Sequence, residues 1–366
     1  MKASALKYAV LSLAASLCLL IIAIIPFHAF LTVWAASSFS HYTSFRLWKE
    51  IILVIIGVAV LFLAMTDFKI RSHTFTRRLV QLVLAYIVLH LVFGVIALKL
   101  GHVTPKALGY AWLVDLRFLV FFLLVWSIAI RSKRMRSNWH NLILIPAGIV
   151  VAFGLLQFLV LPDDFLRHFG YNAMTIEPYE TVNSNRDFVR VTSTLRGPNP
   201  LGAYLIIPIA TAAVLAIRAE RKWRYILFTL LALTVVGASF SRSAVLGALI
   251  SIGIIIVLSA RSAQAKNMLK VAAVGVVLVV VLGFSLVHKN SRIETVVLHT
   301  QTNSKVATSS NDGHIKAVQE GVSSIVHEPL GRGPGTAGPA SVYNNGITRI
   351  AENYFIQIGQ EVGILD

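Results

Sequence analysis

The segment around Arg196 has a composition that suits anion binding. It reads T-L-R-G-P-N-P-L-G over residues 194–202 and comes immediately before an apolar stretch. Its Gly-Pro and Asn-Pro pairs restrict the backbone to turns, and Pro200 can serve as the first residue of a helix. This arrangement predicts an arginine fixed at a membrane edge, where it binds either a substrate anion or the phosphate of a lipid headgroup.

A second arginine, Arg242, lies in the sequence S-F-S-R-S-A at residues 239–244, between two short apolar stretches. A guanidinium forms a bidentate fork that matches phosphate, so this tight turn is a second anion-binding candidate. Three serine hydroxyls are additional candidate donors: Ser239, Ser241 and Ser243. The alternative is a helix hairpin capped by serine, with an arginine that reaches for lipid.

The last part of the chain contains a third group of chemically capable residues. Residues 313–326 place apolar side chains at helical spacing, which predicts an amphipathic helix that ends before Pro329. Arg332 follows in P-L-G-R-G-P-G, and E-N-Y-F begins at Glu352. The glycines formally match the dinucleotide pattern G-x-G-x-x-G, but a proline interrupts it and no strand precedes it. We therefore interpret them as positions of close backbone approach.

Few ionisable residues lie inside the apolar stretches. Asp115 and Arg117 are two residues apart, so they do not share a helix face and each needs another partner. His90 is isolated in the middle of an apolar run, which favours a histidine whose hydrogen bonds are satisfied within a helix bundle. The lone Cys18 excludes an intramolecular disulfide and a cysteine metal site.

These residues belong to a chain whose composition indicates a membrane protein. It has 366 residues, of which 56% are hydrophobic and 13% charged, and its mean hydropathy of +0.74 is too high for a water-soluble surface. Apolar runs of about 17 to 25 residues predict an all-α polytopic bundle of about nine transmembrane helices. The runs lie at residues 8–30, 50–68, 79–98, 109–130, 142–161, 200–217, 225–239, 244–260 and 271–287.

The distribution of positive charge predicts the orientation. About half of the 33 Lys and Arg residues lie in the N-terminal tail and in alternate short loops, which places these loops and the N-terminus in the cytoplasm. Residues 1–287 are then a transmembrane domain with an external segment at 162–199. Residues 288–366 form an external loop that leads into a further membrane segment. The dispersed positive charge favours a lipid bilayer over nucleic acid as the partner.

The order of these motifs resembles that of the O-antigen ligase and polymerase family of bacterial membrane glycosyltransferases. The resemblance covers residues 196–366: a basic turn before a helix, then S-R-S-A, and then a late external loop with P-L-G-x-G-x-G and E-N-Y. It implies an enzyme of polysaccharide and lipopolysaccharide biosynthesis in the inner membrane of the cell envelope. The chain ends where the family continues with further helices, so we expect it to be C-terminally truncated.

The resemblance also implies a reaction and a set of site residues. The donor is a glycan on a polyprenyl pyrophosphate such as undecaprenyl pyrophosphate, and the acceptor hydroxyl belongs to a glycan, a lipid or a protein. Arg196 and Arg242, together with Arg332, are expected to bind the pyrophosphate without a metal or another cofactor. Many family members have His-Asn in the late loop, whereas this chain has Glu352 before Asn353. The resemblance therefore makes Glu352 the expected catalytic base, with His314 and His327 as alternatives.

Two other functions are compatible with the sequence. A polymerase of the same family uses a second carrier-linked glycan as its acceptor, and sequence does not separate it from a ligase. A polysaccharide flippase or secondary transporter would explain the helices without the late loop. Transporters tend to have inverted repeats and binding groups near the bilayer midplane, and neither feature is evident in this sequence.

Overall fold

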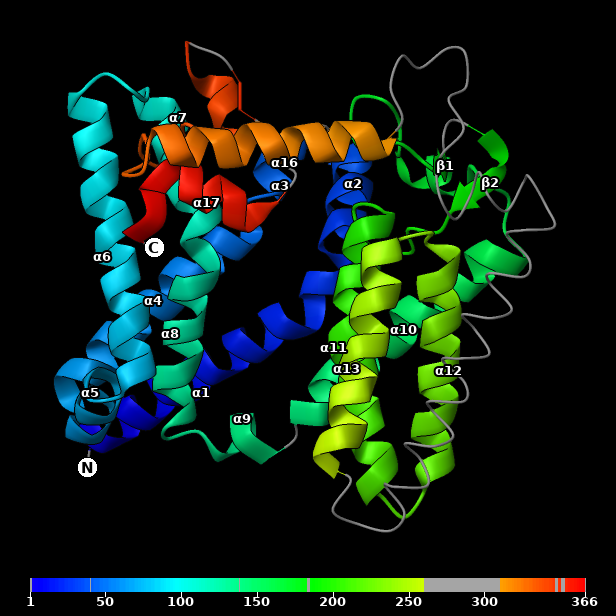
Figure 1. Cartoon of the computed structure of the whole chain (residues 1–366). Helices are drawn as coiled ribbons and strands as arrows, with labels where there is room; N and C mark the ends of the chain where they lie inside the picture. Colours follow the sequence, from blue (N-terminus) through cyan, green and yellow to red (C-terminus); the bar gives the residue numbers. More distant parts are fainter. Residues whose placement is uncertain are drawn as a thin grey trace. The chain divides into compact units, whose positions relative to one another are not determined.

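The computed structural model in Figure 1 describes residues 2–259 except 40, 138, 183 and 184, and residues 310–365 except 346, 347 and 350–352. Helices dominate these residues. The α-helices are α1 (Lys2–Ile24), α2 (His28–Phe39), α3 (Tyr42–Phe45), α4 (Trp48–Thr66), α5 (Phe68–Phe75), α6 (Arg78–Lys99), α7 (Pro105–Asp115), α8 (Arg117–Ala129), α9 (Lys133–Ser137), α10 (Trp139–Leu159), α11 (Pro198–Arg218), α12 (Lys222–Ala238), α13 (Arg242–Ser259), α16 (Ser310–His327) and α17 (Tyr354–Val362).

The structure confirms the prediction of a polytopic helical membrane protein. Among the described residues, 6 helices are long and apolar enough to cross a membrane, and 7 if α7 and α8, bent by 41°, form one broken span. Six of the eight predicted runs up to residue 260 each coincide with one described helix, whereas residues 8–30 fall on α1 and α2 and residues 109–130 on α7 and α8. Helix α12 has 17 residues and is therefore about 25 Å long, somewhat shorter than a hydrocarbon core of about 30 Å. The last predicted run, residues 271–287, lies outside the described residues.

The chain forms two compact units, each assembled from separate stretches of sequence. Unit 1 comprises Met1–Ala15, Leu53–Lys133 and Ser304–Asp366, and unit 2 comprises Ser16–Ile52 and Arg134–Asn303. Arg196 and Arg242 thus belong to unit 2, whereas Arg332 belongs to unit 1.

The core of unit 2 is a tight bundle of α10, α11, α12 and α13. Leu201, Leu205 and Ile209 of α11 are fully buried in it. Gly202 lets α11 approach α13 closely, because a Cβ built there would collide with the Cβ of Ala244. Small residues at such crossings are typical of membrane helices, where packing replaces the hydrophobic effect.

Residues 162–199 of unit 2 contain a β-hairpin that the sequence analysis did not predict. Strands β1 (Glu180–Val182) and β2 (Asn185–Arg190) pair antiparallel, with Glu180 opposite Arg190. Residues 181, 182, 188 and 189 are Thr, Val, Phe and Val, which favour strands. These strand-forming residues are few and lie among turn-forming residues, so the sequence pattern did not indicate the two strands.

In unit 1, the amphipathic helix predicted at residues 313–326 is confirmed as α16, which is slightly longer. Helix α16 packs on α17 (Figure 1), and glycines permit the contact on both sides. A Cβ at Gly321 would collide with Ile356, and one at Gly359 would lie 2.7 Å from Ile325. The loop after α16 returns to the start of α7, where Thr104 donates its backbone N–H to the Asn344 side chain at 3.0 Å.

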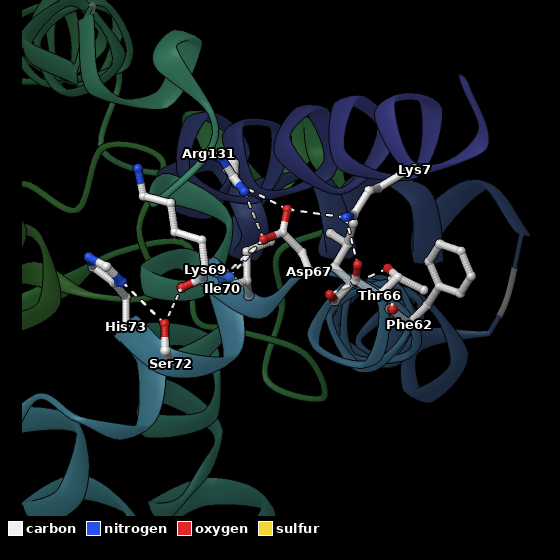
Figure 2. Close-up of polar contacts among 10 residues, drawn as sticks. Lys7, Phe62, Thr66, Asp67, Lys69, Ile70, Ser72, His73 and Arg131 are labelled. Carbon is white, nitrogen blue, oxygen red and sulfur yellow. Dashed lines mark hydrogen bonds and ion pairs between the residues drawn. The ribbon is translucent and has the colours of Figure 1, made fainter. Parts of the chain in front are cut away.

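A buried carboxylate ties three parts of unit 1 together (Figure 2). Asp67 caps α5 by accepting from the backbone N–H of Lys69 and Ile70. Arg131, just after α8, donates to both carboxylate oxygens at 2.9 and 3.0 Å, and Lys7 of α1 lies 3.4 Å away. The Arg131 guanidinium is the main reason that the pKa of Asp67 is lowered to about 2.

Asp67→Asn tests this junction, since asparagine preserves the helix cap and removes only the charge. The native pKa lies below the ordinary value of 3.8, so the ionised carboxylate stabilises the fold above that value and this stabilisation disappears as the pH falls through about 2. We expect Asp67→Asn to lower the free energy of unfolding at pH 7 by about 2 kcal/mol. Thermal unfolding of the purified protein in detergent measures this.

The deficit should be constant between about pH 5 and pH 8, because Asp67 is ionised throughout that range. Asp163→Asn is the matched control, since Asp163 is exposed and makes no ion pair with a described residue. Equal melting temperatures for Asp67→Asn and the unmodified chain at pH 7 would show that the junction contributes nothing.

Candidate functional site

The two arginine segments of unit 2 come together where α11 and α13 begin. Gly202 in the first turn of α11 faces the second segment: a Cβ there would lie 3.3 Å from the Cβ of Ser241 and 3.5 Å from the hydroxyl of Ser239. The backbone N–H of Val191 also donates to the carbonyl of Ala238, at 3.1 Å. Segments about 46 residues apart in sequence therefore share one end of the bundle.

Arg196 is the most available cation in this group. It is exposed and makes no hydrogen bond or ion pair with any residue that the structure describes. Gly197, which follows it, is the N-cap of α11, and Pro198 is the first helical residue. The guanidinium thus lies beside a helix N-terminus, whose free N–H groups and dipole favour an anion.

Arg242 occupies the equivalent position on the neighbouring helix. It is exposed and is the first residue of α13, an 18-residue helix. Because α12 runs back between them, α11 and α13 begin at the same end of the bundle. Two arginines and two helix N-termini thus concentrate positive charge at this end, as the binding of a polyphosphate requires.

Arg190 connects the two segments, and the sequence analysis missed it. Its Nε donates to the Ser239 carbonyl at 3.0 Å, and its second terminal nitrogen donates to Asn199 at 2.7 Å. Glu180 lies 3.4 Å from the remaining nitrogen. One planar guanidinium thus holds one residue from each arginine segment. Its partners lie 9 and 49 residues away in sequence, so no local pattern singled it out.

One residue in a strained backbone conformation comes immediately before the Arg196 segment, and another lies within the Arg242 segment. Ser193 and Phe240 are the described non-glycine residues with positive φ, each at 50°. Ser193 is held there because its N–H donates to Gln157 at 2.6 Å and its hydroxyl donates to the Val150 carbonyl at 2.7 Å. Such conformations persist only where surrounding contacts impose them, and they concentrate at functional sites.

The structure corrects part of the prediction for the three serines. Ser239 is fully buried and donates its hydroxyl to the Val236 carbonyl at 2.6 Å, so it cannot serve an external ligand. Its oxygen also accepts from the N–H of Ser241, which is buried. Ser243 is exposed. Ser239 therefore shapes the turn, and of the three serines Ser243 is the accessible donor.

In unit 1, Arg332 shares a carboxylate with a second arginine. Glu328 accepts from Arg332 at 2.7 Å and from Arg349 at 3.1 Å. Partial burial raises the pKa of Glu328, but the two hydrogen bonds outweigh this effect and lower the pKa overall. Two guanidinium groups face one carboxylate, so the group keeps a net positive charge. Both arginines line a cavity of about 730 Å³.

Of the three candidate bases, the structure describes the surroundings of His327 in most detail. Glu352 lies outside the described residues. His314 belongs to α16. His327, the last residue of α16, is exposed and lines a second cavity of about 640 Å³ with Glu328 and Arg349. Its Nδ1 lies 2.7 Å from the Ser323 carbonyl, which can only accept, so Nδ1 carries the proton and Nε2 is left as the acceptor.

The glycine-rich loop around Arg332 lies against helices of unit 1. Gly333 and Gly335 have φ values of 102° and 89°, which side chains rarely adopt. A Cβ at Gly333 would collide with Ala97 of α6, and one at Gly335 would lie 3.0 Å from the backbone of Ala107 in α7. These glycines thus allow one segment of the chain to approach another.

Comparison with known families adds the decisive observation. Residues 227–365 match the family model of the O-antigen ligases. This segment is an O-antigen ligase domain. No curated protein and no solved structure matches the chain.

The O-antigen ligase domain takes in most of the predicted site residues. It includes Arg242, Arg332 and Glu352, together with both alternative histidines. It begins after Arg196, and the helix that follows this arginine, α11, packs on α12 and α13 of the domain. The domain therefore supports a function of the O-antigen ligase or polymerase type and a membrane glycosyltransferase activity in general.

Gly202→Ala tests the contact that brings the arginine segments together. The added methyl group must push α13 away, and overpacking of this kind typically costs about 1 to 3 kcal/mol. We expect a lower thermal unfolding temperature in detergent. Gly253→Ala in α13 is the matched control, because a Cβ there meets nothing within 4 Å. That variant should be unchanged or stabilised by up to about 1 kcal/mol. Equal behaviour of the two variants would contradict the close contact.

Proposed function

We propose that this protein transfers a glycan from a polyprenyl pyrophosphate carrier to an acceptor hydroxyl on the external face of the inner membrane. One observation carries the proposal: Arg196 and Arg242 stand at the N-termini of two packed helices, in a chain with an O-antigen ligase domain. The pyrophosphate is the group that two guanidiniums and two helix N-termini would bind best. Arg332 is a further candidate from unit 1.

The proposed reaction needs these cations when the pyrophosphate leaves the sugar. The bond between the anomeric carbon and the pyrophosphate oxygen breaks, and the acceptor oxygen forms the new bond to that carbon. The departing pyrophosphate gains negative charge, which fixed guanidinium groups stabilise without a metal in the transfer step. Arg190 acts as a positioning residue, since it holds the turn that precedes Arg242 against the segment that follows Arg196.

A base must take the proton of the acceptor hydroxyl, and we assign this role to Glu352. The assignment is supported by its place in the O-antigen ligase domain, in the E-N-Y sequence of the late segment. A carboxylate can act as a base at neutral pH when desolvation raises its pKa. His327, whose Nε2 is left as a proton acceptor, is the next candidate, followed by His314.

The acceptor decides between two reactions of this kind. With lipopolysaccharide core or another final acceptor the protein is a ligase, and with a second carrier-linked glycan it is a polymerase. We favour the ligase because the matched family model is that of the O-antigen ligases. In this proposal the N-terminus is cytoplasmic and the arginine segments face outward, where translocated donors are available.

Replacing either Arg196 or Arg242 with alanine should weaken binding of the pyrophosphate carrier by roughly 2 to 3 kcal/mol, about 30- to 150-fold, because each loses a charge-assisted phosphate contact. Lysine should restore only part of the affinity, since an ammonium cannot reproduce the planar fork. Binding of a fluorescent polyprenyl pyrophosphate to the purified protein measures both effects.

Arg186→Ala is the matched control for these variants. Arg186 is an exposed arginine in the same external segment and makes no ion pair with a described residue, so its loss should leave carrier affinity unchanged. Unchanged affinity in both Arg196→Ala and Arg242→Ala, with folding intact, would return these residues to a role at the lipid surface.

Glu352→Gln should abolish most of the turnover and preserve carrier binding, because glutamine retains the shape of the side chain but cannot accept the proton. A positioned base typically contributes about 100- to 10,000-fold to such a step. Glu352→His should retain measurable activity, because a neutral imidazole can also accept the proton. Glycan transfer to an acceptor, measured beside carrier binding, separates the two effects. Normal turnover of Glu352→Gln would move the role to His327 or His314.

A further inference from the structure

Three buried ionisable side chains meet in unit 1, which is not the unit that contains the two arginine segments. His90 comes from α6, Asp115 from the end of α7 and Glu361 from α17, and their exposed fractions are 0%, 2% and 0%. One potential ligand atom from each lies within 4.8 Å of the other two. Elements far apart in sequence thus bring one imidazole and two carboxylates to a single interior point.

Glu361 is oriented toward this point by the glycine-rich loop. Its Oε1 accepts from the backbone N–H of Gly335 at 2.9 Å and from that of Ala337 at 3.4 Å. Its Oε2 is buried and has no hydrogen-bond partner among the described residues. One oxygen therefore fixes the carboxylate in place, and the other is left for the cluster.

His90 corrects the expectation of a histidine with satisfied hydrogen bonds. Both of its ring nitrogens are buried, and neither has a partner among the described residues. The ring stacks on Tyr86, with centroids 4.7 Å apart, which restricts its orientation. Asp115 likewise has one buried oxygen, Oδ1, without a described partner, and its carboxyl group is hydrogen-bonded by the side chain of Tyr354.

The charge of this cluster requires compensation. Two carboxylates beside a neutral imidazole carry two negative charges, and the ion pairs described above for unit 1, those of Asp67 and Glu328, involve neither carboxylate. Unpaired charges in a protein interior are expensive, and side chains of this kind are usually paired or coordinate a metal.

We propose that His90, Asp115 and Glu361 bind a divalent transition metal ion, with Zn²⁺ the best match. One imidazole nitrogen and two carboxylate oxygens form a ligand set that Zn²⁺ accepts, with metal–ligand distances of about 2.0 to 2.2 Å. Side-chain movements on the order of 1 Å bring the three atoms to that spacing. The two positive charges of the ion neutralise the two carboxylates.

The bound ion has a structural role in this proposal. It joins α17, which lies in the O-antigen ligase domain, to α6 and α7, which precede that domain. Through Glu361 it also holds the backbone of the glycine-rich loop. The inference does not depend on the proposed transfer reaction, in which no metal takes part.

Metal content of the full chain tests the proposal. The protein is purified in detergent, stripped with a chelator, incubated with Zn²⁺ and desalted, and zinc is measured by mass spectrometry. We expect about one Zn²⁺ per chain and a higher thermal unfolding temperature with zinc than without it. His90→Gln and Glu361→Gln should lose both effects. His102→Gln and Glu320→Gln, which change exposed residues of the same unit, are matched controls and should retain both.

Measurements on the unmodified chain decide the question even if the variants fail to fold. Co²⁺ in place of Zn²⁺ should give ligand-field absorption bands typical of nitrogen and oxygen ligands. A folded, monodisperse chain that retains no zinc and gives no such bands overturns the proposal. So does zinc that remains at full stoichiometry in folded His90→Gln and Glu361→Gln. An infrared band of a protonated carboxylic acid in the unmodified chain, absent in Glu361→Gln, would assign a shared proton instead of a metal and would also overturn it.

Discussion

The close approach of α11 and α13 is the contact on which the candidate site depends. Because Gly202 has no side chain, the start of α11 lies directly against Ala244, and two helix N-termini end up at the same end of the bundle. Lipid offers backbone groups no hydrogen-bond partners, so polar chemistry in such a protein is concentrated at helix ends and in the segments that connect them. The arginine segments occupy these positions, and Arg190 with its three hydrogen-bond partners keeps them in register.

The two units arrange their arginines differently. In unit 2, Arg196 has no described partner and its charge is available to a ligand. In unit 1, Arg332 and Arg349 are both engaged by Glu328, which reduces their charge but orients them. The two arginines held by Glu328 have fixed orientations beside a cavity, which favours recognition of an anion of matching shape. Arg196, which has no described partner, keeps its full charge and therefore attracts an anion more strongly.

Features set by local composition could be predicted from the sequence, and features set by distant contacts could not. The apolar runs sufficed to predict the membrane helices, and the spacing of residues 313–326 predicted α16. Arg190 was missed because its partners, Asn199 and Ser239, are distant in sequence. The hydroxyl of Ser239 was predicted to be a donor for a ligand, because the neighbouring sequence does not reveal that this residue is buried. His90 was expected to be satisfied by a neighbouring helix, yet its ring meets two carboxylates from α7 and α17.

The contacts made by residues 344–361 also set an order of events during synthesis. The hydrogen bond from Thr104 to Asn344 cannot form until the ribosome has added a residue 240 positions later in the chain. The contacts of His90 and Asp115 with Glu361 must form later still, because Glu361 follows Asn344 in the sequence. Until then α6 and α7 reside in the membrane with polar side chains that lack their final neighbours, which is an unfavourable state in hydrocarbon. Unit 1 is therefore the part of the molecule most exposed to surveillance by membrane proteases and chaperones while the chain is incomplete. Unit 2, whose α10 to α13 bundle is contiguous except for the hairpin segment, can complete its packing earlier.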